Sequence, residues 1–186
     1  MQRLNLTLPQ TWKALIEKVY KTGKAKAIGV SNFSQAELEH LIKGSDVAPH
    51  AHQIELHPYL QQKSFVDFHK KNNIVLTAYS PFGNANEIYD AGKKLPKLIQ
   101  DPVLVEIGKK YNKSGAQVAL AWGFTSGHSV IPKSKTPSRI ADNMGGMFKL
   151  SDVDMKKIAD LDKKARFNDS SADFGKSFFD GLDGKH

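Results

Sequence analysis

The first regular pattern along the chain is helical, because apolar residues recur at three- and four-residue spacing across Trp12–Tyr20. Gly23 predicts the end of this helix, and the apolar run 25–33 (AKAIGVSNF) predicts a strand after it. The pattern of a capping box occurs at three predicted helix starts: Thr7 with Gln10, Ser34 with Glu37, and Ser114 with Gln117.

Three further apolar runs predict three more strands. They lie at 50–58 (HAHQIELHP), 74–83 (IVLTAYSPFG) and 129–134 (SVIPKS). Helices are predicted after these runs, and a long loop, 84–100, precedes a helix that begins at Asp101 and Pro102. Strands that alternate with helices predict an α/β fold whose sheet is parallel.

Each predicted strand begins apolar and ends polar. The polar endings are Ser31 and Asn32, Gln53 with Glu55 and His57, Tyr79 and Ser80, and Lys133 and Ser134. In parallel α/β folds, the carboxyl ends of the strands meet at one edge, where ligands bind. We therefore expect these side chains to form one shared site.

The segment 130–143 (VIPKSKTPSRIADN) combines cations and hydroxyls at a predicted helix start. Thr136 before Pro137 is expected to cap the helix with its hydroxyl. Free N–H groups at a helix start attract phosphate, and Lys133 and Arg139 add charged donors. The alternative interpretation is a solvated basic loop that only begins a helix.

Length and composition favour one soluble domain, 1–186, with a substantial core, since 40% of the 186 residues are hydrophobic. No apolar run approaches the roughly 18 residues of a membrane span, and no secretory signal is recognisable at the start. The absence of cysteine excludes disulfides and fits a reducing, cytoplasmic location.

The formal charge of +8 raises the hypothesis of nucleic-acid binding. The lysines are spread over nearly every predicted helix, however, and no aromatic residues interleave with them as stacking platforms. We expect no nucleic-acid partner. The histidines His50, His52 and His57 with Glu55 raise the hypothesis of a metal site, but ordinary burial and hydrogen bonding explain them better, and no metal is expected.

Four segments together resemble one enzyme family. GVSNF (29–33), HQIELHPYL (52–60), TAYSPFG (77–83) and IPKSKTPSRIADN (131–143) are similar, in order and spacing, to motifs of the aldo-keto reductases. The resemblance implies a (β/α)8 barrel of the TIM type, of which this chain holds about four of the eight strands. The C-terminal tail, 167–186, resembles fungal NADP-dependent glycerol dehydrogenases and glyceraldehyde reductases.

The resemblance also implies a site for NADPH/NADP+. Carried over by motif, the nicotinamide carboxamide contacts Ser31, Asn32 and Gln53, and its ring stacks on Tyr79. The pyrophosphate lies near Ser80 and the backbone of Phe82. The adenosine 2′-phosphate contacts Lys133, Ser134, Thr136 and Arg139, and the adenine edge contacts Asn143.

The family's catalytic tyrosine, lysine, aspartate and histidine are expected upstream of Met1, so no catalytic residue is assigned in this chain. Tyr79 is not expected to replace the tyrosine acid, because its motif places it against the cofactor ring. We expect a fragment of a complete reductase. The alternatives are a half barrel that folds alone and two copies that close one barrel.

The implied activity is NADPH-dependent reduction of aldehydes or ketones, with small sugar-like aldehydes such as glyceraldehyde as substrates, or glycerol in reverse. The alternative is an inactive NADP-binding or interaction protein. A complete reductase is expected to be monomeric, whereas an exposed half barrel favours self-association. Phe174, Phe178 and Phe179 in the tail form an apolar pocket wall or simply pack onto the barrel.

Overall fold

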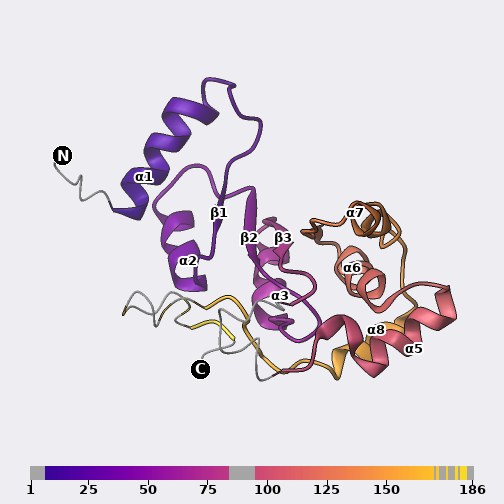
Figure 1. The fold of residues 1–186 in the computed structure, drawn as a ribbon. Helices are drawn as coiled ribbons and strands as arrows, with labels where there is room; N and C mark the ends of the chain where they lie inside the picture. The colour runs from indigo at the N-terminus through magenta and orange to yellow at the C-terminus, as the bar shows by residue number, and fades with distance from the viewer. Residues whose placement is uncertain are drawn as a thin grey trace.

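The computed structural model describes residues 7–83, 95–169, 171, 175, 179 and 181–183. Its elements, in chain order, are α1 (Leu8–Leu15), the π-helical turn η1 (Ile16–Tyr20), β1 (Gly29–Ser31), α2 (Gln35–Lys43), β2 (Ala51–Glu55), α3 (Lys63–Lys71), β3 (Val75–Tyr79), the 3-10 turn η2 (Leu98–Gln100), α5 (Pro102–Tyr111), α6 (Gly115–Thr125), β4 (Ser129–Ile131), α7 (Pro137–Met144) and α8 (Asp152–Ala159) (Figure 1). The predicted alternation of strands and helices is confirmed. None of the helices in the described ranges has the length and apolar content needed to cross a bilayer.

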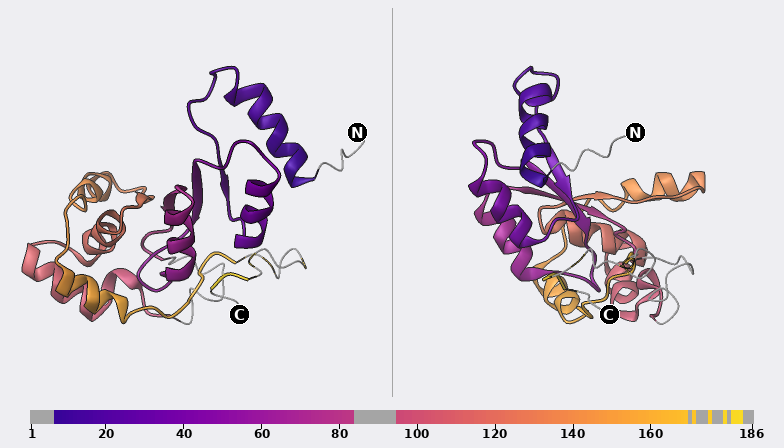
Figure 2. Two further views of the ribbon diagram at one scale, coloured as in Figure 1. Left: turned by 180° about the vertical axis from the view of Figure 1, so that it is seen from behind. Right: turned by 90° about the vertical axis from the view of Figure 1, so that its left-hand side faces the viewer.

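The four strands form one parallel sheet in the order β1-β2-β3-β4, as expected for part of a (β/α)8 barrel. Neighbouring strands are therefore also neighbours in the sequence. Within the described residues, β1 and β4 each have a strand on one side only. Helices α2 and α3 lie on one side of the strands in the right-hand view of Figure 2, while α7 extends away from the sheet.

The sheet buries one of its two faces. On the covered face, His52, Ile54 and Leu76 are each less than 4% exposed. On the opposite face, Val75 of β3 is 57% exposed and Ile131 of β4 is 45% exposed. Parallel sheets are normally covered on both faces, so this chain leaves the barrel-lining face of its sheet open.

Two groups of buried side chains hold the helices against the covered face. The larger group joins the sheet, α5, α6, α8 and the C-terminal segment, and it contains Leu38, Ile54, Leu76, Leu104, Trp122, Ile158, Phe167 and Phe179 among others. The smaller group, Trp12, Ile16, Ile28 and Leu41, holds α1 near α2. The Trp12 indole N–H donates to the Val47 carbonyl at 2.8 Å, which satisfies the polar atom of this buried ring.

Helix α8 is an element that the sequence patterns above did not predict. Its start is capped by Ser151, whose hydroxyl accepts from the Asp154 N–H. The Asp154 carboxylate accepts from Lys110 and from the Tyr111 hydroxyl, both at 2.6 Å, and so joins α8 to α5. Burial alone would raise the pKa of Asp154, but these hydrogen bonds outweigh it and lower the pKa to about 2.

Two predictions about helix ends need correction. Thr136 lies at the start of α7 as predicted, but its hydroxyl makes no capping hydrogen bond. Instead, the Ser134 hydroxyl accepts from the Thr136 N–H at 3.1 Å. The first helix does not continue regularly to Gly23, because it changes to a π-helical turn at Ile16 and ends at Tyr20.

Three histidines lie buried between the sheet and α3. His52 and His69 share a hydrogen bond of 2.7 Å between ring nitrogens, and His52 also accepts from the Phe33 N–H. Burial, together with the charge of His69, lowers the pKa of His52 to about 3. Burial, with smaller effects of Lys70 and His69, lowers the pKa of His128 to about 4. The fold therefore requires these rings in their neutral form.

We expect stability to fall as the pH drops below about 6.5, because the unfolded chain then binds more protons than the folded one. The loss amounts to up to ~1.4 kcal/mol per pH unit for each histidine, until the folded pKa is reached. Urea denaturation at about pH 7.5 and about pH 5 measures this loss of unfolding free energy. Both pH values lie above the range where carboxylates titrate. Replacing His128→Gln should reduce the change of unfolding free energy with pH. The control His40→Gln, on the exposed side of α2, should not, and equal slopes for both variants would contradict the argument.

The loop after β3 contacts the C-terminal segment through Gly83. Gly83 has φ +65°, and a Cβ added there would lie 2.9 Å from a ring carbon of Phe167. Phe167 is 2% exposed. The glycine is therefore required both by its backbone conformation and by the ring beside it.

Replacing Gly83→Ala should lower the free energy of unfolding by about 2–4 kcal/mol, from backbone strain and overpacking against Phe167. Gly23→Ala is the matched control, since Gly23 has φ +73° but no atom within 4 Å of an added Cβ. The Gly23→Ala variant should lose only the free energy of the backbone strain, about 1 kcal/mol. Urea denaturation measures both variants, and equal losses would show that the Phe167 ring moves aside without cost.

Candidate functional site

The carboxyl ends of β1 and β2 bring three of the predicted cofactor residues together. Ser31 is paired with Gln53 across the sheet, and its hydroxyl donates to the Gln53 carbonyl at 2.9 Å. The backbone N–H of Asn32 donates to the same carbonyl at 3.1 Å. Among the described residues nothing bonds to the side-chain amide of Gln53, which is exposed on the open face. A ligand amide would find donors and acceptors here.

Tyr79 ends the neighbouring strand and is half-buried. Burial raises the pKa of Tyr79 to about 12, and the charge of Glu55 adds to this effect, while Arg166 and a hydrogen bond from Asn32 oppose it. The hydroxyl is therefore protonated and neutral near pH 7. A tyrosine of raised pKa is a poor proton donor, which agrees with its expected role as a stacking surface.

Ser80 and Phe82 follow β3 at the same edge. Ser80 adopts a left-handed backbone conformation, with φ 49°, and its hydroxyl accepts from the Asn168 side chain at 3.0 Å. Phe82 is half-buried against the larger core group. The sequence did not indicate that the C-terminal segment would reach the loop predicted to meet the pyrophosphate.

The predicted phosphate-binding residues follow β4 at this edge of the sheet. Lys133, Thr136 and Arg139 are exposed, and α7 buries none of its residues. Because Thr136 makes no side-chain cap, its hydroxyl is available beside the first-turn N–H groups of α7. Neither Lys133 nor Arg139 forms an ion pair in the part of the chain that the structure describes. This combination of cations, hydroxyls and helix start suits a phosphate dianion.

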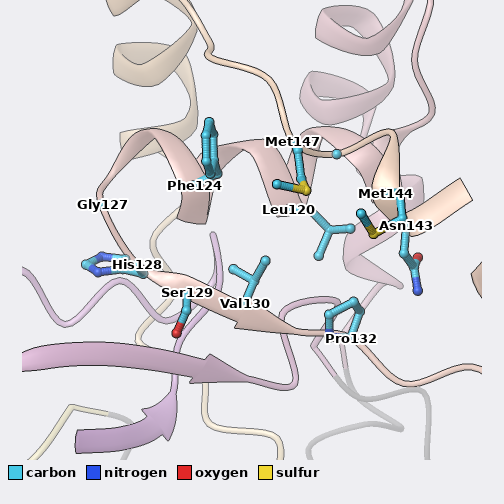
Figure 3. A pocket seen from close by; sticks show the side chains of 11 residues that line it. Leu120, Phe124, Gly127, His128, Ser129, Val130, Pro132, Asn143, Met144 and Met147 are labelled. Atoms are coloured by element: carbon cyan, nitrogen blue, oxygen red, sulfur yellow. The ribbon is translucent and has the colours of Figure 1, made fainter. Parts of the chain in front are cut away.

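A separate apolar pocket lies between α6, β4 and α7, with a volume of about 520 Å³. Figure 3 shows Leu120, Phe124, Val130 and Met147 around this hollow, with Asn143 and Pro132 at one end. Of the predicted cofactor residues, only Asn143 lines it. The pocket lacks the charges of a phosphate site, so it is distinct from the basic residues that follow β4.

Glu55 is a buried charge at this edge, and its partners could not be predicted from the sequence pattern. One carboxylate oxygen accepts from the Phe167 N–H at 2.7 Å and from His57 Nε2 at 3.0 Å; the other accepts from the Asn168 N–H at 3.0 Å. Arg166 lies 3.9 Å away. Burial alone would raise the pKa of Glu55, but His57, the Phe167 N–H and Arg166 together hold it below its usual value. A glutamate within an apolar strand was the only sequence signal.

The histidine-rich strand β2 does not gather metal ligands. In the described ranges no group of three or more histidine, aspartate or glutamate side chains converges as a metal site would require. His52 is bonded to His69 and His57 to Glu55, so hydrogen bonding accounts for both rings. In the tail, Phe179 is 5% exposed within the larger core group, whereas Phe174 and Phe178 lie outside the described residues.

Comparison with known proteins agrees with this geometry. The model of the aldo/keto reductase family matches residues 4–163. The chain is 45% identical over 166 residues to an uncharacterized oxidoreductase of Schizosaccharomyces pombe, covering 88% of this chain and 50% of that protein. It is 43% identical over 164 residues to the NAD(P)H-dependent D-xylose reductase of Candida tenuis, covering 86% of this chain and 51% of that protein.

A solved structure shows the same fold. The crystal structure of an aldo/keto reductase from Brucella melitensis superimposes with a TM-score of 0.73 at 44% identity, covering 83% of this chain and 55% of that one. The chain spans about half the length of the curated relatives it matches. Sequence and fold agree, and the chain belongs to the aldo/keto reductase family.

Proposed function

We propose that this chain binds NADP(H) along the carboxyl ends of its four strands and provides the cofactor-binding part of an NADPH-dependent reductase of aldehydes and ketones. The observation that carries the proposal is the sheet register, which pairs Ser31 with Gln53 and places Tyr79 one strand away at the same edge. The basic residues after β4 follow the adjacent strand. The NAD(P)H dependence of relatives such as the Candida tenuis enzyme supports the choice of cofactor.

The residues at this edge fit the parts of the cofactor. The amides of Asn32 and Gln53 suit the nicotinamide carboxamide, because they offer both donors and acceptors. The neutral ring of Tyr79 suits stacking against nicotinamide. Lys133 and Arg139 suit the 2′-phosphate that distinguishes NADP from NAD.

When bound, the nicotinamide supplies the hydride that reduces a carbonyl carbon. The part played by this chain is to hold the nicotinamide ring, orient it and bind the adenosine phosphate. We do not assign Tyr79 as the proton donor, because burial raises the pKa of its hydroxyl to about 12.

The substrate class that we favour is small sugar-like aldehydes such as glyceraldehyde, with glycerol as the substrate in the reverse direction. Similarity of the tail to fungal glycerol dehydrogenases and glyceraldehyde reductases supports this choice, as does the sugar named for the Candida tenuis relative. The absence of cysteine supports a cytoplasmic location, which stays a prediction.

Replacing Arg139→Ala should weaken NADPH binding by about 1.5–3 kcal/mol, the range for hydrogen bonds to charged groups. NADH binding should change little, because NADH lacks the 2′-phosphate. Fluorescence titration of the 186-residue chain with each cofactor measures both affinities. Lys24→Ala is the control, since this exposed lysine precedes β1, at the opposite edge of the sheet.

Equal losses for NADPH and NADH would contradict the assignment of Arg139 to the 2′-phosphate. A chain that binds neither cofactor would overturn the proposed function itself. NADPH binding without turnover of glyceraldehyde would instead favour the alternative of an inactive NADP-binding protein.

A further inference from the structure

The segment that follows α8 is attached to β2 by its backbone. Both oxygens of the buried Glu55 accept hydrogen bonds from the consecutive N–H groups of Phe167 and Asn168. These residues lie 112 and 113 positions away in the sequence. Because the donors are main-chain groups, the carboxylate determines the path of the chain whatever side chains the segment carries. Glu55 is itself 0% exposed, so its position is also fixed.

The side chains of the same segment act on two predicted cofactor residues, one through a hydrogen bond and one through charge. Asn168 donates from its amide to the Ser80 hydroxyl at 3.0 Å. Burial raises the pKa of Tyr79, and the nearby charge of Arg166 opposes that rise. The residues expected beside the nicotinamide and the pyrophosphate are thus supported by the C-terminal segment as well as by the strands.

Arg166 also connects this segment to the end of the chain. Its guanidinium lies 4.1 Å from the centre of the Phe179 ring and donates to the Asp183 carbonyl at 2.9 Å. Arg166 is 1% exposed. A buried guanidinium has a large desolvation cost, so its partners must stay in place for the arrangement to be stable.

We propose that Glu55 is a positioning residue: by anchoring Arg166–Asn168 at the edge of the sheet, it makes the C-terminal segment a support for Tyr79 and Ser80. The inference rests on the proposed function. It assigns the affinity for the nicotinamide half of the cofactor partly to the tail, and the affinity for the 2′-phosphate to the residues after β4. Because coupling is reciprocal, bound NADPH should in turn hold the tail in place.

Glu55→Gln tests the proposal with little change of shape. The new NH2 group cannot accept a hydrogen bond, so at least one of the N–H groups of Phe167 and Asn168 loses its partner. Three measurements on the 186-residue chain are needed: NADPH affinity by fluorescence, the affinity for adenosine 2′-monophosphate, and the rate of tryptic cleavage after the exposed Lys163 and Lys164.

The expected result separates the two halves of the cofactor. NADPH affinity should fall about tenfold, within the usual range of coupling between sites. Affinity for adenosine 2′-monophosphate should be unchanged, because that ligand lacks the pyrophosphate and reaches only the residues after β4. Tryptic cleavage should be faster in Glu55→Gln, and NADPH should slow it in the unaltered chain. Glu106→Gln, at an exposed glutamate of α5, is the control and should change none of these.

Each other outcome would contradict either the positioning role of Glu55 or the proposed cofactor-binding function. Equal loss of both ligands in Glu55→Gln, or faster cleavage with unchanged NADPH affinity, would overturn the positioning role. An unaltered chain that binds neither ligand would overturn the proposed function instead. If Glu55→Gln does not fold, Asn168→Ala decides: it removes only the Ser80 contact among the bonds above and should weaken NADPH binding about threefold, while leaving the binding of adenosine 2′-monophosphate unaffected. Unchanged NADPH affinity in that variant would also overturn the inference.

Discussion

A carboxylate buried at the end of a strand is the constraint that organises this structure. Glu55 is stable as an anion only because His57 and the N–H groups of Phe167 and Asn168 surround it, with Arg166 nearby. Those partners come from the end of β2 and from the segment after α8. The cost of leaving such a charge without partners therefore holds the C-terminal segment on the sheet.

The second constraint is that one face of the sheet is fully covered, whereas most of the other face is open. Helices bury the face that carries Ile54 and Leu76, whereas the C-terminal segment covers only the carboxyl end of the other face, at Glu55. The other face presents Ser31, Gln53 and Ser129 to solvent. In a closed barrel this face lines the interior, and its polar residues at the carboxyl ends are the ones that meet a ligand.

These two constraints act on the same edge of the sheet. The strands place Ser31, Gln53 and Tyr79 by register. The anchored segment bonds to Ser80 and brings the charge of Arg166 near Tyr79. The basic residues after β4 depend on neither, since α7 buries no residue and both Lys133 and Arg139 are exposed. The proposed cofactor site therefore consists of one well-supported end and one exposed, electrostatic end.

Local features were readable from the sequence because their causes act over a few residues. Hydrogen bonds within three residues confirm the capping pairs Ser34 with Glu37 and Ser114 with Gln117. The four apolar runs became the four strands, and the motifs at their ends identified the family. Even helix α8 carried a local signal, Ser151 three residues before Asp154, that the apolar pattern did not reveal.

The tertiary structure alone decided which residues meet over long separations. No local pattern links Glu55 to Phe167, 112 positions away, or Ser80 to Asn168, 88 positions away. Burial and charge likewise depend on the whole fold, so the raised pKa of Tyr79 and the lowered pKa of Glu55 could not be predicted from residue type. By itself the sequence determined the four strands, most of the helices, their order and the chemistry at the strand ends, because these depend on neighbours along the chain. The fold determined the support behind that chemistry, because desolvation and hydrogen bonding depend on neighbours in space.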